Sequence, residues 1–455
     1  MLRLFDSAVL SSVEVIEPGA TSLTLYNCGP TVYDDPHIGH GRAILTFDLL
    51  RRYLEYRGVS VTHVSNITDI DDKIIERASD RKVLPSEIAE EYETRWWAAV
   101  DALGAKRPNH APRATEWIPQ MRDLVLRLVD SGAAYAGDDG VYLEVHKVAD
   151  YGLLARQDLG DLRAGARVAT QAFKRSPLDF ALWKFSETEP SYEFSLGNGR
   201  PGWHTECVVM SLGLLGEGFD LHGGGLDLRF PHHENERAQA VALGATFAKH
   251  WIHHGFVEVS GEKMSKSLGN FTTLTDLLAH VDPRAYRLLV ARAHYRSPLE
   301  VGPGLLDEAT ATLGRIDRFM QRVVDVERAF GGEYDPEYYD SAAGNFVLAM
   351  DDDLDSPRAM AGLFDAISRA NADFDAGAIP QALGAGRAIR DIVDALGLVK
   401  QEEVEIPAAI TELADRRVAA KSARDFALAD RIREEIMERG YLIDDIPDGF
   451  RLRRK

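Results

Sequence analysis

The segment 22–64 constrains the fold of this chain most, because it reads as a strand, a loop, a helix and a second strand. Polar and apolar side chains alternate over 22–28, and Gly29-Pro30 ends that strand. An amphipathic stretch over 37–58 then precedes a second strand at 59–64. A helix that joins two strands in this way makes them parallel. The sequence therefore predicts an α/β fold built on a Rossmann-type parallel sheet.

The remaining chain divides into parts of different character. Short strand-like pieces and loops rich in Arg, Gly and Pro occupy about 115–200, which we interpret as an insertion into a Rossmann-type domain covering 1–290. Apolar residues at spacings of three and four predict an all-α helical bundle over 291–400. A small C-terminal domain is expected over 401–455. Its segment 411–455 holds eleven Lys and Arg against ten Asp and Glu.

Net charge and cysteine content limit the partners and the cellular compartment that we expect for the chain. With 52 Lys and Arg against 72 Asp and Glu, the net charge of −20 argues against a nucleic-acid partner, although net charge does not exclude a local basic surface. Two cysteines, Cys28 and Cys207, cannot form a disulfide framework, so we expect a reducing, cytoplasmic location. No run approaches the ~18 consecutive apolar residues of a membrane span. A soluble protein without a membrane partner is predicted.

The first motif with chemical content is His37-Ile-Gly-His40, where a strand passes into a helix. This is where open α/β sheets bind ligands and where a helix N-terminus attracts phosphate. Gly39 lets a nucleotide approach the backbone closely. Alone, the pair of histidines is more often explained as surface residues or half of a metal site.

The second motif is Lys263-Met-Ser-Lys-Ser267, a segment flanked by glycines that follows a strand. Two ammonium groups three residues apart suit a polyphosphate whose charge shifts while pyrophosphate departs. An exposed flexible loop is the alternative, and the presence of the histidine pair makes it the weaker interpretation.

Together the two motifs resemble the HIGH and KMSKS signatures of class I aminoacyl-tRNA synthetases, and Tyr26–Asp34 resembles the cysteinyl-tRNA synthetase branch. The resemblance extends over nearly the whole chain, through segments 66–73, 179–184, 199–204, 222–227, 230–236, 294–298, 350–353 and 425–431. It implies activation of L-cysteine by ATP with Mg²⁺ to cysteinyl-adenylate, and transfer to the 3′ end of tRNA(Cys). It also implies a monomer whose helical bundle binds tRNA and whose C-terminal domain binds the anticodon.

Four residues form a credible zinc set. Cys28 and Cys207 supply thiolates, while His232 and Glu236, four residues apart on one helix face, supply an imidazole and a carboxylate. From the residues alone, two distant cysteines are more often small buried hydrophobic groups than metal ligands. The resemblance implies these four residues as the ligands of one Zn²⁺ per chain. His233 is the competing imidazole, expected to point about 100° around the helix from His232.

A zinc ion would allow the site to bind cysteine in preference to serine. A discrimination of ~10⁴ requires about 5.5 kcal/mol, which shape alone cannot provide for sulfur against oxygen. A soft thiolate binds Zn²⁺ where a poorly acidic hydroxyl does not. A purely structural zinc, closed by four protein ligands, is the alternative.

The resemblance also assigns roles to single residues. Catalysis is expected from His37, His40, Lys263 and Lys266. The expected ATP-binding residues are Gly39, His40, Gly224, Asp227 and Lys266. Thr68 and Trp203 are expected to line the amino-acid pocket, although Trp203 could equally be a core aromatic residue.

Two other functions remain open from the sequence. A ligase that joins cysteine to an amino-sugar in mycothiol synthesis would share the cysteine-activating core but would be shorter after the lysine motif. A non-catalytic RNA-binding paralogue would usually have damaged motifs, whereas His37, His40, Lys266 and both cysteines are present.

Overall fold

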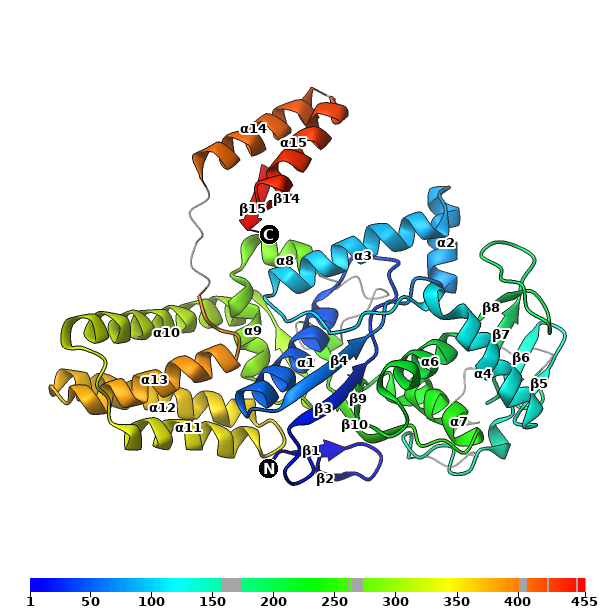
Figure 1. Ribbon diagram of the computed structural model, residues 1–455, viewed down its shortest axis with the longest axis horizontal. Coiled ribbons are helices and arrows are strands. Elements are labelled where there is room, and N and C mark those ends of the chain that lie inside the picture. The colour runs from blue at the N-terminus through cyan, green and yellow to red at the C-terminus, as the bar shows by residue number, and fades with distance from the viewer. Residues whose placement is uncertain are drawn as a thin grey trace. The chain divides into compact units, whose positions relative to one another are not determined.

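The computed structural model describes residues 1–156, 174–259, 262–263, 273–400, 407–423, 425–446 and 449–454 (Figure 1). The chain forms two compact units, Met1–Leu398 and Val399–Lys455. Among the described residues, no helix combines the length and the apolar character needed to cross a bilayer.

A four-stranded parallel sheet lies at the centre of the first unit, in the order β10-β9-β3-β4 (Figure 1). Its strands are β3 (Ser22–Asn27), β4 (Ser60–Ser65), β9 (Phe219–Gly225) and β10 (Ala248–His254). Helix α1 (Ile38–Tyr56) connects β3 to β4 and buries Phe47 and Leu50 in the core that contains Leu25 of β3. The predicted α/β class and parallel sheet are confirmed.

A glycine allows α1 to approach the sheet closely. A Cβ atom on Gly223 of β9 would lie 2.3 Å from a ring carbon of Phe47, so a larger residue would displace that ring. The start of α1 lies beside the carboxyl ends of the strands, since His37 and His40 line the same pocket as the last residues of the strands.

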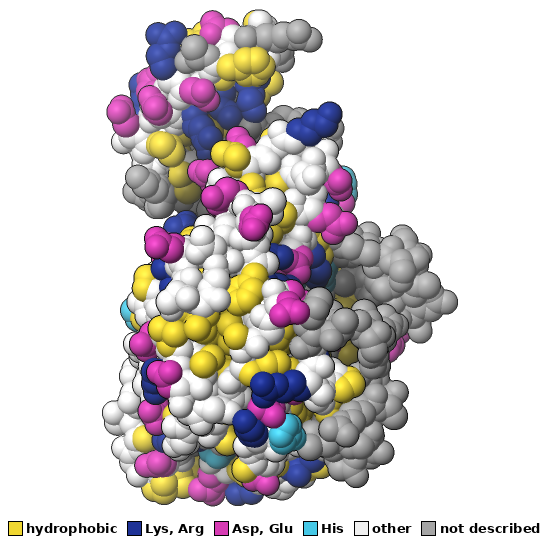
Figure 2. All heavy atoms as spheres, turned by 90° about the vertical axis from the view of Figure 1, so that its right-hand side faces the viewer, with side chains coloured by type: hydrophobic (Ala, Val, Ile, Leu, Met, Phe, Trp, Pro, Cys, Tyr) yellow, Lys and Arg dark blue, Asp and Glu magenta, His cyan; other side chains and the backbone are white. Residues whose placement is uncertain are grey.

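The chain between β4 and β9 builds a second, antiparallel sheet in the order β5-β6-β7-β8. The elements of this stretch are α2 (Asp72–Arg81), α3 (Pro85–Ala102), η1 (Ala114–Trp117), α4 (Ile118–Asp130), β5 (Ala134–Ala136), β6 (Gly140–Leu143), η2 (Val145–Lys147), β7 (Phe180–Phe185), β8 (Gly199–Pro201) and α6 (Trp203–Leu215). Figure 2 views this side of the molecule, where described acidic and basic side chains are interspersed around apolar ones.

After β9 the chain passes through a π-turn, η3 (Arg229–His233), and α7 (Glu234–Ala242) to reach β10. A small sheet then forms in the order β12-β11-β13. Its strands and the helices among them are β11 (Val257–Val259), β12 (Glu262–Lys263), α8 (Leu274–His280), α9 (Pro283–Ala291) and β13 (Leu299–Val301).

Four helices form the predicted bundle: α10 (Pro303–Phe330), α11 (Pro336–Met350), α12 (Ser356–Asp375) and α13 (Ile379–Ala395). Their apolar faces share one core with α1, where Phe346 meets Tyr53 edge to face at 5.9 Å between ring centroids. The N-terminal strands β1 (Arg3–Asp6) and β2 (Ser11–Glu14) form a hairpin.

The second unit has its own small core, which includes Ile410, Ile432 and Ile443. It contains α14 (Ala408–Ser422), α15 (Phe426–Glu438) and the antiparallel pair β14 (Tyr441–Ile446) and β15 (Gly449–Arg454).

Candidate active site

A pocket of about 460 Å³ opens at the carboxyl ends of the central strands. The last residue of each strand, Asn27, Ser65, Gly225 and His254, lines it. The expected site residues that also line it are Cys28, His37, Gly39, His40, Trp203, Gly224 and Asp227. Seven residues from distant parts of the sequence therefore share one cavity.

The histidine pair caps the start of α1. His37 is the N-cap residue, and its Nδ1 accepts a hydrogen bond from the backbone N–H of His40 at 3.3 Å. In return, Nδ1 of His40 accepts from the backbone N–H of His37 at 3.1 Å. The rings stack at 3.7 Å between centroids. Because both Nδ1 atoms act as acceptors, a neutral ring carries its proton on Nε2, where it is a donor at the helix N-terminus.

The lysine motif falls mostly outside the described residues. Lys263 lies in β12, where its backbone pairs with Glu258 of β11. Lys266 lies in the segment 264–272, which the structure does not describe.

Four expected metal ligands come together, and we call Cys28, Cys207, His232 and Glu236 the donor cluster. One donor atom from each lies within 4.8 Å of the others. Cys28 follows β3, and the other three come from α6, η3 and α7. The Cys28 Sγ atom is 3.8 Å from Cys207 Sγ and 3.5 Å from Glu236 Oε1. Cys207 Sγ is 3.7 Å from His232 Nε2, which is 2.7 Å from Glu236 Oε1.

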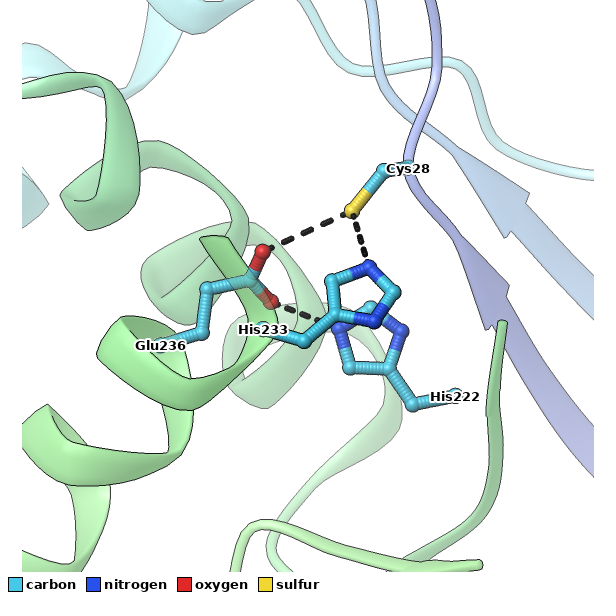
Figure 3. Close-up of side chains that lie close together, drawn as sticks. All are labelled: Cys28, His222, His233 and Glu236. Carbon is cyan, nitrogen blue, oxygen red and sulfur yellow. Dashed lines mark hydrogen bonds and ion pairs between the residues drawn. The ribbon is translucent and has the colours of Figure 1, made fainter. Parts of the chain in front are cut away.

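A second set of donors overlaps the first. Cys28 and Glu236 also lie beside His222 and His233, and Figure 3 shows both imidazoles turned toward them. His233 Nε2 is 3.3 Å from Cys28 Sγ, and His222 Nε2 is 2.6 Å from Glu236 Oε2. The described residues thus offer two overlapping groups that could hold a metal ion.

The two adjacent histidines of η3 contact different members of the cluster: His233 Nε2 faces Cys28, whereas His232 Nε2 pairs with Glu236. The one residue of η3 with non-helical dihedral angles is Phe230, which precedes both histidines. Sequence reasoning missed His222 as a neighbour of the cluster. Its place at the start of segment 222–227, which resembles the family, was the available signal.

Burial and neighbouring charges set the protonation of the donor cluster. Burial opposes ionisation of Cys207, but the hydrogen bond from Cys28 and the nearby His232 lower its pKa to about 6. Burial also opposes ionisation of Glu236, yet His232 and His222 hold its pKa well below the usual value. Beyond the cluster, His204 Nδ1 lies 2.8 Å from Nδ1 of His232. Burial raises the pKa of the Cys28 thiol well above its usual value, and Glu236 raises the pKa of His232 to about 10 against the effect of burial. Cys207 and Glu236 are therefore the anionic members of the cluster, and a bound cation would displace protons from Cys28 and His232.

The two residues expected in the amino-acid pocket have different surroundings. Trp203 lines the pocket with 38% of its surface exposed, and it stacks on His232 at 4.0 Å between centroids, so it is not a core aromatic residue. Thr68 is 1% exposed and is not among the pocket-lining residues. Its hydroxyl donates to Glu206 Oε2 at 2.8 Å and accepts from Asn66 Nδ2 at 3.1 Å.

The end of β9 supplies the other wall of the pocket. A Cβ atom on Gly224 would lie 2.8 Å from the His233 ring, so glycine permits the strand to pass beside this imidazole. Asp227, in the turn that follows, also lines the pocket and is exposed.

Comparison with known proteins agrees with this arrangement. Residues 14–311 match the family described as tRNA synthetases class I (C) catalytic domain, and residues 345–400 match the DALR domain. The chain is 39% identical to a cysteine–tRNA ligase of Caldicellulosiruptor saccharolyticus over 100% of both chains. It is 44% identical to that of Clavibacter sepedonicus over 98% of both.

Solved structures agree on the fold. Methionyl-tRNA synthetase of Mycobacterium tuberculosis in complex with methionyl-adenylate is similar with a TM-score of 0.66 at 14% identity, covering 84% of this chain and 92% of that one. The catalytic-domain match establishes the class I aminoacyl-tRNA synthetases as the wider group, and the full-length relatives establish the cysteine–tRNA ligases as the branch. The chain belongs to the cysteine–tRNA ligase family of class I aminoacyl-tRNA synthetases.

Proposed function

We propose that this protein activates L-cysteine with ATP, forming cysteinyl-adenylate and pyrophosphate, and transfers the cysteinyl group to the 3′ end of tRNA(Cys). One observation carries the proposal. Cys28 is both a member of the donor cluster and a wall of the pocket that His37 and His40 line. A thiol held at the cluster would therefore lie in the same cavity as a nucleotide at the start of α1.

The donor cluster would hold one Zn²⁺ through Cys28, Cys207, His232 and Glu236. Three of its edges measure 3.8, 3.7 and 3.5 Å. A tetrahedral zinc with Zn–S bonds of ~2.3 Å has edges to sulfur of roughly 3.5 to 3.8 Å, so the three contacts that involve sulfur fit the ion. The fourth contact, 2.7 Å between His232 Nε2 and Glu236 Oε1, is an ion pair that would open to the ~3.3 Å that separates two such ligands of one zinc. We favour this set over the one with His222 and His233 because it contains two cysteine sulfur atoms, and zinc prefers cysteine ligands, which bind as thiolates. When bound, zinc would supply a soft Lewis acid that distinguishes a thiolate from a hydroxyl.

Each residue of the pocket then has a role. The Nε2–H groups of His37 and His40 and the N-terminus of α1 would stabilise charge on the phosphates, together with Lys263 and Lys266. Gly39, Gly224 and Asp227 would contact the adenosine. Trp203 would cover the bound cysteine beside His232. Thr68 does not line the pocket and would act indirectly, through its hydrogen bond to Glu206. Catalysis by these residues is orientation and electrostatics, because the cysteine carboxylate itself attacks the α-phosphorus.

We infer that the helical bundle binds tRNA through a basic groove. Two adjoining grooves of about 480 and 430 Å³ run between α10 and α12 and share Arg315 and Phe364. We call the side chains Arg292, Arg315, Arg318 and Arg322 that line them the arginine groove. Glu308 pairs with Arg292, and Asp375 pairs with Arg322. Within the described part of the chain, Arg315 and Arg318 have no carboxylate partner, so they are available to phosphates.

Neither of the alternative functions is favoured. The relatives quoted above are cysteine–tRNA ligases that match essentially the whole chain, including the bundle and the C-terminal unit. Anticodon binding by residues 401–455, Mg²⁺ with ATP, a monomeric state and a cytoplasmic location stay predictions.

Cysteine-dependent exchange of pyrophosphate into ATP, followed by charging of tRNA, tests the proposal. We expect exchange with cysteine, little with serine, and transfer to tRNA(Cys). Exchange without charging would favour the amino-sugar ligase. Absence of exchange in a metal-replete preparation would favour the non-catalytic paralogue.

A further inference from the structure

Arg42, in the second turn of α1, is a buried cation without a carboxylate partner among the described residues. Its side chain is 1% exposed. Burial lowers its pKa to about 10, so it remains protonated at neutral pH. Buried charges are ordinarily paired with an opposite charge. A residue that departs from this rule beside a substrate pocket requires an explanation.

Backbone carbonyl groups replace the missing anion. The Nη1 atom donates to the Phe256 carbonyl at 2.7 Å. The Nη2 atom donates to the carbonyls of Tyr295 at 2.9 Å and Ser297 at 2.5 Å, with a longer contact of 3.3 Å to His294. Its Nε atom has no partner among the described residues. The guanidinium therefore donates its hydrogen bonds to two chain segments, at 256 and 294–297, that lie more than 210 residues away in sequence.

These two segments join the pocket to the lysine motif. Phe256 lines the pocket and lies between β10 and β11. Strand β11 pairs on one side with β12, which contains Lys263, and on the other with β13, which follows Ser297. The segments are in close contact, since a Cβ atom on Gly255 would lie 2.5 Å from the Ser297 carbonyl oxygen.

The start of α1, which contains the histidine motif, is also held in place by a hydrogen bond. Tyr286 of α9 donates its hydroxyl to the Ile38 carbonyl at 2.6 Å, which holds the first turn of α1. The same turn contains His40, and Arg42 follows two residues later. The first two turns of α1 therefore contain both the histidine motif and the cation that binds the strand leading to the lysine motif.

We propose that Arg42 is a positioning residue that sets the distance between the histidine motif on α1 and the strand pair from which the lysine motif begins. The inference rests on the proposed adenylate-forming reaction. Two motifs on opposite sides of one triphosphate must be held in register, and a displacement of about 1 Å can cost ~10²-fold in rate. A guanidinium suits this task because its planar fork of five donors contacts several carbonyl groups at once, whereas an ammonium group acts as a point charge.

Arg287 provides a matched control inside the same unit. It is similarly buried, at 3% exposure, but it pairs with Asp48 and donates to the Leu103 carbonyl. Neither Asp48 nor Leu103 belongs to the segments that Arg42 binds. Replacement of Arg287 should therefore lower stability without misaligning the two motifs.

The test compares Arg42→Lys with Arg287→Lys in the full-length, metal-replete protein. For Arg42→Lys we expect the kcat of cysteine-dependent pyrophosphate exchange to fall ~100-fold, with metal content and the KM for cysteine within about twofold of the unsubstituted protein. Amide hydrogen exchange over 255–259 should rise. Arg287→Lys should lower the melting temperature and leave kcat and that amide exchange unchanged. Added guanidinium should partly restore kcat in Arg42→Ala.

Several results would overturn the inference. Unchanged kcat in Arg42→Lys would do so, as would equal losses of kcat in both lysine variants at the same fraction folded. If the unsubstituted protein shows no exchange activity, the proposed function fails instead. Amide exchange then decides the role of Arg42 alone, and unchanged protection over 255–259 would refute it.

Discussion

The donor cluster and the arginine groove are both gatherings of charged side chains, but they are built in opposite ways. Three members of the cluster are at most 1% exposed, and its donors contact one another. In the groove, Arg315 and Arg318 are exposed and lack carboxylate partners in the described part of the chain. Buried donors at fixed distances suit one small ion, whereas exposed cations along a helix suit an extended anion.

The largest effect is expected from Cys207→Ser, which should remove the metal from the donor cluster and leave the arginine groove unchanged. Cys207→Ser removes a thiolate whose pKa of about 6 keeps it ionised at neutral pH. We expect loss of zinc and a decrease of ~10³-fold in the preference for cysteine over serine, out of the ~10⁴ that the reaction requires. Metal analysis and exchange assays with both amino acids measure this. Affinity for tRNA should not change, and unaltered discrimination would refute the role of the cluster in selectivity.

Lys266→Ala tests whether adenylate formation can be slowed without changing metal binding at the donor cluster or tRNA binding at the arginine groove. Loss of a cation that stabilises the departing pyrophosphate should slow adenylate formation ~10² to 10³-fold. Rapid-quench measurement of adenylate formation gives the rate. Zinc content and tRNA affinity serve as controls, and loss of the metal in this variant would contradict the division of roles.

His204→Gln probes the support of the cluster rather than its donors. Because His204 Nδ1 lies 2.8 Å from Nδ1 of His232, its loss should weaken zinc binding ~10-fold. Competition with a chelator of known affinity measures the change. The control is His250→Gln, since His250 pairs with Asp6. Equal zinc affinity in the two variants would show that His204 does not orient the ligand.

The smallest effect is expected in the groove. Arg318→Glu should weaken tRNA binding about 5 to 10-fold and reduce the slope of log affinity against log salt by roughly one. Filter binding at several salt concentrations reports both quantities, while cysteine activation stays unchanged. The comparison breaks down if Arg318→Glu impairs exchange but leaves tRNA affinity intact.

Much of the fold follows from local pattern. The alternation over 22–28 and the amphipathic stretch over 37–58 correspond to β3 and α1, because these elements bury one face against a common core. The bundle follows from the same rule. Net charge misled the first interpretation, because −20 is a sum over the chain and does not reveal where Arg315 and Arg318 lie.

The site was harder to predict wherever distant segments meet. Spacing alone could align His232 with Glu236, and they lie 2.7 Å apart. It could not foresee that His233 lies beside Cys28, because that contact depends on how η3 packs against the end of β3 rather than on helical period. The carbonyl groups around Arg42 had no signal in the sequence at all, since backbone acceptors are the same in every residue type.

The separation of the cluster's members in sequence has a consequence for synthesis of the protein. Cys28 is translated about 200 residues before Glu236, and β9 and β10 enter the sheet only after the intervening insertion. At ~5 to 20 residues per second, this leaves the first thiol on the nascent chain for roughly 10 to 40 s before its partners exist. The ribosome-bound chain therefore passes through a period in which Cys28 is an ordinary reactive thiol, open to oxidants and to adventitious metals.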